Sequence, residues 1–269
     1  MADLPAFFPD HTCPPGALAA GFRDGERGTH TSRTTMVAEL ADLLASHPDV
    51  STRAGFARAV VEGNALGKAT HATRKLTAQR LAELYGLDDD IPLFRALRGL
   101  WRLDPDGRLQ LATLVALARD PLFRASAPAV VTLAPGDTPA KHEVAQAIGE
   151  VTGARFNDDI LDKIARNVLA SWTRSGHLEG RVRKVRHRLE PTPYAVAFAI
   201  HLAILAGHVP ARALGSGWLA VLDLDATRAA AAAREAHRRG LINYRAGTGV
   251  VEISTDRLLA LAGVADVAH

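Results

Sequence analysis

The residues in this chain best suited to chemistry are cations that gather between residues 157 and 188. The segment NDDILDKIARNVLASWTRSGHLEGRVRKVRHR predicts an amphipathic helix, a Ser-Gly stop and a ribbon with Arg, Lys or His at most positions. The ribbon, residues 178–189, carries Arg181, Arg183, Lys184, Arg186 and Arg188. Clustered long cations suit phosphate binding, because each contact releases counterions condensed on a nucleic-acid backbone. The alternative is a solvated edge strand whose charges prevent sheet-to-sheet pairing.

The helix expected over residues 158–174 must position the remaining cations of this segment. Its apolar residues recur at helical spacing: Ile160, Leu161, Ile164, Val168, Leu169 and Trp172. Other faces carry Lys163, Arg166, Asn167 and Arg174. A helix, a turn and a basic ribbon are typical of a winged-helix nucleic-acid binder, in which Arg166 and Asn167 are candidate base readers. These polar residues could equally form the solvated side of an ordinary surface helix.

A second group of cations lies in an N-terminal region with a helical pattern. Lys68, Arg74 and Lys75 stand near one end of a helix that Thr70 can cap, and they are candidate phosphate contacts. A salt-bridged bundle surface explains them as well. The stretch GNALGKAT resembles a phosphate loop, but the spacing between its glycines is one residue short and Ala69 replaces the magnesium-binding hydroxyl.

The rest of the sequence supplies no catalytic or metal-binding pattern. The 11 histidines are scattered, the single cysteine excludes an internal disulfide, and no Gly-x-Ser-x-Gly elbow occurs. We therefore expect a binding protein without cofactor or metal rather than an enzyme. The net charge of +3, the 48% hydrophobic content and the lack of a signal-peptide pattern or a long apolar run favour a soluble cytoplasmic protein without a membrane partner.

Changes in sequence texture divide the chain into four segments of a mainly α protein. We expect a flexible N-terminal arm over residues 1–30, a helical bundle over 31–135, a winged-helix-like unit over 136–191 and a second such unit over 192–269. Pro135–Pro139 is the candidate linker, and Ser51, Thr70, Asp104 and Asp120 are expected caps in the bundle. In the last unit Asp225 precedes an Ala-rich helix over 226–239, and the turn Ala246–Gly249 predicts a hairpin.

Two stretches of the chain carry a family resemblance. The bundle sequence VVEGNALGKATHATRK followed by RLAELYG, and the later DKIARNVLASWTRSGHLEG, resemble the BrxA family of BREX bacteriophage-defence systems. The resemblance covers roughly Thr29 to Leu189. It implies a small helical cytoplasmic protein, with a bundle similar to the RNA-binding antitermination protein NusB, that is associated with DNA binding.

The resemblance also implies a set of candidate residues. These are Asn64, Lys68, Thr70, Thr73, Arg74, Lys75, Asn167, Trp172, Gly176 and Leu178. Asn64 also suits the left-handed conformation at a helix end, and Trp172 and Leu178 suit a core.

Together these patterns lead us to expect a non-enzymatic DNA-binding accessory protein of a BREX-type phage-defence system. Its partners would be double-stranded DNA, with RNA possible, and other defence proteins. Two alternatives stay open: a winged-helix scaffold that binds partner proteins, and a dimeric transcriptional regulator. The sequence leaves the oligomeric state undetermined.

Overall fold

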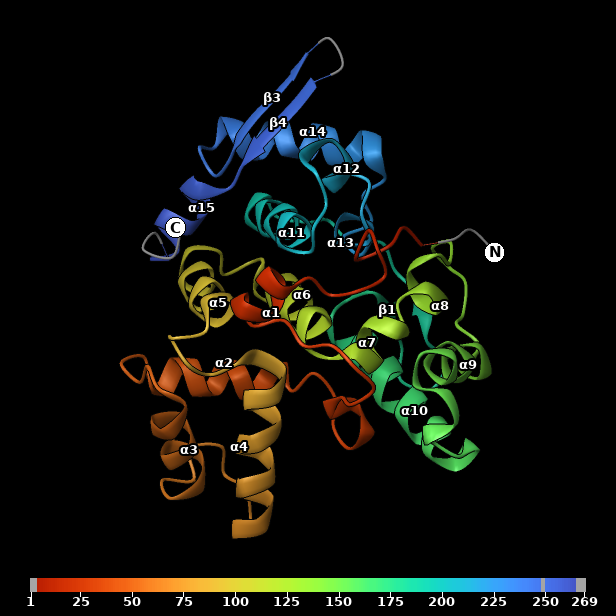
Figure 1. The fold of residues 1–269 in the computed structure, drawn as a ribbon. Coiled ribbons are helices and arrows are strands. Elements are labelled where there is room, and N and C mark those ends of the chain that lie inside the picture. The colour runs from red at the N-terminus through yellow and green to blue at the C-terminus, as the bar shows by residue number, and fades with distance from the viewer. Residues whose placement is uncertain (1–3, 248–249, 265–269) are drawn as a thin grey trace.

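A computed structural model of the chain describes residues 4–247 and 250–264 (Figure 1). Helices make up most of it, and the strands form two small antiparallel hairpins, which confirms the mainly α fold class. The helical elements up to residue 131 are α1 (Pro15–Ala20), η1 (Thr29–Thr31), α2 (Val37–Ser46), α3 (Arg53–Val61), α4 (His71–Tyr85), α5 (Pro92–Leu103), α6 (Arg108–Arg119), α7 (Pro121–Ala125) and α8 (Pro128–Val131).

The second half of the chain repeats a helix-then-hairpin order. Its elements are α9 (Lys141–Thr152), η2 (Gly153–Arg155), α10 (Asp158–Arg174), β1 (Leu178–Glu179), β2 (Val185–Arg186), α11 (Pro193–Leu205), α12 (Pro210–Ala213), α13 (Gly217–Ala220), α14 (Ala226–Arg238), β3 (Asn243–Gly247), β4 (Val250–Ser254) and α15 (Asp256–Leu261). The predicted helices over 158–174 and 226–239 are therefore confirmed, the second to within one residue.

Helix α6 lies in the middle of the molecule and packs against α4, α5, α7 and α11 (Figure 1). Every side chain from Leu111 to Arg119 is buried. A helix with apolar residues all round must be covered on all sides, because no face can be left to water at low cost. Helices of the bundle and of the C-terminal segment therefore pack onto the same central helix.

The helix caps follow local sequence at two of the four expected positions in the bundle. Thr70 accepts a hydrogen bond from the Thr73 amide, and Asp120 caps α7 as expected. The expected cap Ser51 was wrong by one residue: Thr52 accepts the Gly55 amide instead. Asp104 was expected to start a helix, but its carboxylate accepts the Gly107 amide in a turn that precedes α6.

The N-terminal segment differs most from expectation. The predicted loose arm was wrong for residues 4–30, because Phe7, Phe8 and Phe22 are buried. The rings of Phe7 and Phe22 contact the ring of Trp218 at 5.0 and 5.5 Å between centroids. The Trp218 indole also donates to the Phe7 carbonyl at 2.8 Å. The segment packs on an aromatic residue of the last quarter of the chain, which its own composition does not reveal.

The hairpin after α10 is shorter than the predicted ribbon over 178–189. Its strands have two residues each, with Leu178 opposite Arg186 and Glu179 opposite Val185. The expected linker pairs with it, since the Gly136 amide donates to the Arg186 carbonyl and the Arg186 amide donates to the Asp137 carbonyl. This segment is therefore an edge of the hairpin rather than a free connection.

The second hairpin joins β3 to β4 in the predicted place, with Asn243 opposite Ser254 and Gly247 opposite Val250. The rest of its expected turn, residues 248–249, lies outside the described residues. The predicted segments share one continuous hydrophobic core. The Trp172 indole of α10 donates to the Ser126 hydroxyl beside α7, which joins the middle unit to the bundle.

Candidate nucleic-acid interface

Helix α10 separates its residues by face. Ile164, Val168 and Trp172 are fully buried, as the apolar stripe predicts. Lys163, Arg166 and Arg174 are exposed. At spacings of three, eight and eleven residues they lie on the side opposite the stripe. The helix rises about 16 Å between Lys163 and Arg174. Three cations thus follow one solvent-facing side of α10.

The hairpin loop after β1 carries the next cations. Gly180 has a φ of 102°, and a Cβ atom there would stand 2.1 Å from the Arg183 carbonyl oxygen, so the tight turn requires glycine. Arg181 and Arg183 are exposed and flank Val182, whose side chain is 96% exposed. The loop therefore holds two arginines and a valine out in solvent.

One side-chain contact joins this loop to the end of α10. The Lys184 ammonium donates to the Thr173 hydroxyl at 2.7 Å. Partial burial and the positive charge of Arg174 lower the pKa of Lys184 below its ordinary value. The positive charges of Lys184 and Arg174 therefore lie close to each other where α10 meets the hairpin.

We call the exposed face of α10 and the hairpin loop together the cationic strip. It consists of Lys163, Arg166, Arg174, Arg181, Arg183 and Lys184. Within residues 4–247 and 250–264, no carboxylate forms an ion pair with any of them. The strip therefore presents six cations that no carboxylate of these residues pairs with, and such a cluster attracts a polyanion.

Arg186 was predicted to contact nucleic acid, and this prediction was wrong. Its residue is 3% exposed, and its guanidinium forms an ion pair with Asp223. The same group donates to the Val130 carbonyl at 3.1 Å and to the His187 carbonyl. The two-residue strands of the hairpin turn Arg186 inward, where it ties β2 to the chain before α14.

Three further predicted residues are engaged within the molecule. Asn167 donates its amide to the His30 carbonyl at 2.8 Å, which holds this side chain against the N-terminal segment. Lys68 forms an ion pair with Glu39 at 3.1 Å, and Arg74 donates to the Lys68 carbonyl. Lys68 and Arg74 therefore make contacts within the bundle surface, which was the alternative interpretation for these two residues.

The last two predicted residues are exposed but stand apart from the strip. Lys75 belongs to α4, which Figure 1 places with α3 on the side of the molecule away from α9 and α10. Arg188 follows β2 and lines a cavity shared with Asp223 and Asp225. The structure thus brings together six of the twelve predicted residues.

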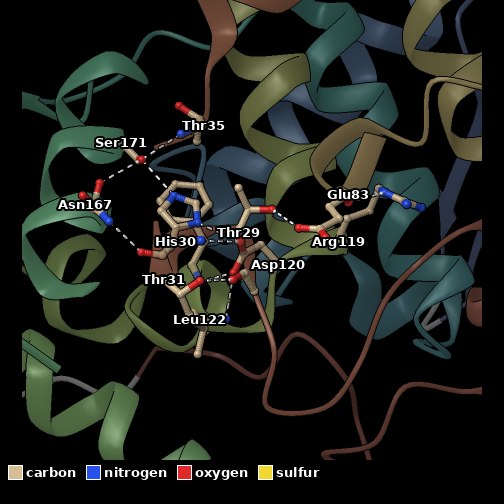
Figure 2. A network of polar contacts seen from close by, with 12 residues as sticks. Thr29, His30, Thr31, Thr35, Glu83, Arg119, Asp120, Leu122, Asn167 and Ser171 are labelled. Atoms are coloured by element: carbon tan, nitrogen blue, oxygen red, sulfur yellow. Dashed lines mark hydrogen bonds and ion pairs between the residues drawn. The ribbon is translucent and has the colours of Figure 1, made fainter. Parts of the chain in front are cut away.

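A buried polar network fixes the hidden side of α10 (Figure 2). The His30 ring contacts the Asp120 carboxylate through Nδ1 and the Ser171 hydroxyl through Nε2, both at 2.8 Å. The Ser171 oxygen also accepts the Thr35 amide at 3.0 Å and donates to the Asn167 carbonyl. The ring stacks on Phe123 at 4.8 Å between centroids. The network clamps the N-terminal segment between α7 and α10.

We call the network of His30, Asp120 and Ser171 the clamp. It has the connectivity of a Ser-His-Asp triad but lies in a different environment. Ser171, His30 and Asp120 are at most 1% exposed, and Ser171 lies inside a helix. Burial alone would raise the pKa of Asp120, but the charge and hydrogen bond of His30 and the backbone amides outweigh it, and the pKa is lowered. Asp120 is thus an ionised, fully hydrogen-bonded anchor. No local pattern predicts this contact, since the three residues are 51 to 141 positions apart in the sequence.

No protein-family model matches the chain, and no curated protein is significantly similar to it. In the described part of the chain, no helix is long and apolar enough to span a membrane. The same residues hold no group of three or more His, Cys, Asp or Glu side chains placed to bind a metal ion.

Proposed function

We propose that this protein binds double-stranded DNA through the cationic strip. The observation that carries the proposal is a set of six long cations along about 16 Å of helix and an adjoining loop, none of which pairs with a carboxylate of the described residues. Phosphates follow each other every 3.4 Å of helix axis on one DNA strand, so a surface of this length faces several of them. Arginine suits such contacts because its planar fork binds phosphate through two hydrogen bonds.

The arrangement of elements supports placing α10 at the DNA. Residues 136–137 pair with β2, and α9, α10 and the β1–β2 hairpin follow in that order. A short segment, two helices and a hairpin that pairs back onto the segment is the order expected of a winged helix. In such a domain the second helix enters the major groove, and we assign that role to α10. The loop with Arg181 and Arg183 then reaches the flanking backbone.

We further propose that this binding serves a non-enzymatic accessory role in a phage-defence complex. The support is the resemblance to the BrxA family, which spans both the bundle and α10. Of the cations that the resemblance singles out in the bundle, Lys68 and Arg74 are held within the molecule. We therefore place the DNA contact on α10 and its hairpin.

The test is a titration of a fluorescent duplex of about 20 base pairs, followed by anisotropy from 50 to 300 mM salt. The slope of log affinity against log salt is expected near −0.9 per phosphate contact, and thus steeper than about −3 for four or more contacts. The double variant Arg174→Glu/Arg183→Glu should bind at least about tenfold more weakly at 100 mM salt and should show a shallower slope.

The matched control is Arg58→Glu/Arg212→Glu, which changes the charge equally at exposed positions of α3 and α12. It should retain most of the affinity, because helices α3 and α12 lie away from α10 (Figure 1). Equal weakening by both double variants would show a response to net charge alone. Absence of duplex binding at 50 mM salt would refute the proposal. An RNA duplex of the same sequence, measured in parallel, identifies the preferred nucleic acid.

A further inference from the structure

A second concentration of positive charge lies around a cavity at the other end of α10. The cavity measures about 390 Å³ and is lined by Arg23, Arg27, Gly28, Thr31, Gln79, Arg80, Glu83, Arg155 and Phe156. Its arginines come from three places: the N-terminal segment, helix α4, and η2 just before α10. None of them belongs to the cationic strip.

The N-terminal segment reaches this cavity because Gly28 allows a close backbone approach. A Cβ atom at Gly28 would stand 2.1 Å from a carboxylate oxygen of Asp120. Thr29, the next residue, donates its hydroxyl to Glu83 at 3.1 Å, and His30 enters the clamp. The wall of the cavity that carries Arg23 and Arg27 is therefore fixed to the core directly after Arg27.

Glu83 is the single carboxylate in the cavity lining, and its oxygens are already engaged. Arg80 donates to one oxygen at 2.6 Å, which Thr29 shares, and Gln79 donates to the other at 2.9 Å. Burial works to raise the pKa of Glu83, but these hydrogen bonds lower it, so the group is ionised. One negative charge thus faces four arginines.

The arginines keep donors that the described residues do not use. The Arg80 Nε–H is buried and has no hydrogen-bond partner there. No carboxylate of residues 4–247 and 250–264 forms an ion pair with Arg27 or Arg23. Arg155 meets Glu26 at 3.3 Å in an exposed pair, which contributes little to holding it.

A further arginine stands behind the cavity. Burial first, and then the charges of Arg23 and Arg53, lower the pKa of Arg119 to about 10. Its guanidinium donates to the Glu83 and Gly21 carbonyls rather than to a carboxylate. The fold thus tolerates the repulsion between Arg119 and Arg23, and backbone carbonyls rather than a carboxylate accept the donors of Arg119.

We propose that this cavity is a phosphate-binding site, held by Arg23, Arg27, Arg80 and Arg155. Convergent guanidinium groups with spare N–H donors match the oxygens of a phosphate group, which accept several hydrogen bonds at once. The volume lies within the range of small-molecule sites, so a phosphorylated molecule of about mononucleotide size fits. A phosphate of a nucleic-acid backbone presents the same chemistry. The proposal does not depend on DNA binding by the cationic strip.

The test is calorimetric titration of the full chain with pyrophosphate and, separately, with AMP at 50 mM salt. Pyrophosphate should bind one to one. The variant Arg27→Gln/Arg155→Gln alters exposed side chains and should weaken binding at least about tenfold. Glu26→Gln removes the acid that competes for Arg155 and should strengthen binding up to about fivefold. The strip variant Arg174→Gln/Arg183→Gln should leave pyrophosphate binding unchanged.

Two results would overturn the site: no pyrophosphate binding by the folded wild-type protein, or equal weakening by the cavity and strip variants. The titration with AMP and a competition with duplex DNA identify the source of the phosphate. Tighter binding of AMP than of pyrophosphate identifies a nucleotide-like ligand, whereas displacement of pyrophosphate by duplex DNA identifies a backbone phosphate. If the strip variants lose DNA binding while pyrophosphate binding persists, the two sites are independent.

Discussion

The two hairpin arginines Arg183 and Arg186 stand three residues apart and should respond oppositely to the same substitution. Arg186→Gln removes the partner of the Asp223 carboxylate, which is 11% exposed and, within the described part of the chain, then keeps the Leu189 amide alone as a hydrogen-bond donor. It also leaves the Val130 and His187 carbonyls without the guanidinium that they share. Breaking a buried pair by removing one member costs about 3–5 kcal/mol.

That cost is measurable as thermal stability. For a chain of this size each kcal/mol lowers the melting temperature by about 2–4 °C, so we expect a fall of roughly 6–20 °C. Arg183→Gln changes an exposed side chain with one weak contact, to the Thr138 hydroxyl at 3.5 Å. Its stability should stay within about 0.5 kcal/mol of wild type. Calorimetry on both variants gives the stabilities, and anisotropy with duplex DNA well below the melting temperature gives the affinities.

We expect opposite results from the two variants. Arg186→Gln should have a lowered melting temperature but still bind DNA when folded, whereas Arg183→Gln should have the melting temperature of the wild type and bind DNA weakly. The double variant Arg186→Gln/Asp223→Asn should recover part of the lost stability, because it removes the unpaired charge. An unchanged melting temperature for Arg186→Gln would refute the inward position of this side chain. An early melt for Arg183→Gln would refute the account of the loop as solvent-exposed.

Three further predictions concern the elements that hold α10 and its hairpin. His177 is 1% exposed and donates to the Val221 carbonyl, and burial lowers its pKa from 6.5 to about 4. The contribution of the neutral His177 ring to the free energy of unfolding is therefore complete above pH 6.5 and is lost as the pH falls toward 4. The loss reaches roughly 3 kcal/mol, and denaturant melts from pH 7 to 4 should show a shallower decline for His177→Gln than for wild type; parallel declines would contradict this. Asp120→Asn keeps the shape of the clamp but removes its charge, and should cost about 2–3 kcal/mol in urea unfolding, against a change below 0.5 kcal/mol if the pair is unimportant. Gly180→Ala forces the turn open and should weaken duplex binding while far-ultraviolet circular dichroism stays unchanged; full affinity would show that the loop shape is irrelevant.

Local signals predicted the elements of this fold well. Helix α10 begins and ends where expected because Asn157 caps it by accepting the Ile160 amide and because its apolar stripe has the helical period. The hairpin of β3 and β4 follows from the strand pattern and the glycines between them. In both cases the determining residues lie within one or two turns of chain.

Long-range contacts decided what the sequence could not predict. Phe7 and Phe8 stand in a Pro-rich segment typical of a loose arm, but both rings pack against Trp218, some 210 positions away. The ribbon of residues 178–189 has a break in its alternation, so pattern alone could not tell that Arg186 turns inward to a carboxylate 37 positions away. Charge type was predictable, and the partner of each charge was not.

The exposed and the buried face of α10 have different roles, and this difference connects the contacts described above to the proposed function. A helix whose exposed cations bind a polyanion must keep its position relative to the rest of the protein. The hydrogen bonds within the helix prevent neither its rotation nor its translation. Ser171 and Asn167 fix it from the hidden side through His30, whose partner Asp120 is itself fixed by two backbone amides of α7. The same N-terminal segment carries Arg23 and Arg27 to the cavity before it reaches His30. The segment expected to be a loose arm is therefore the part that holds the strip and the cavity in one frame.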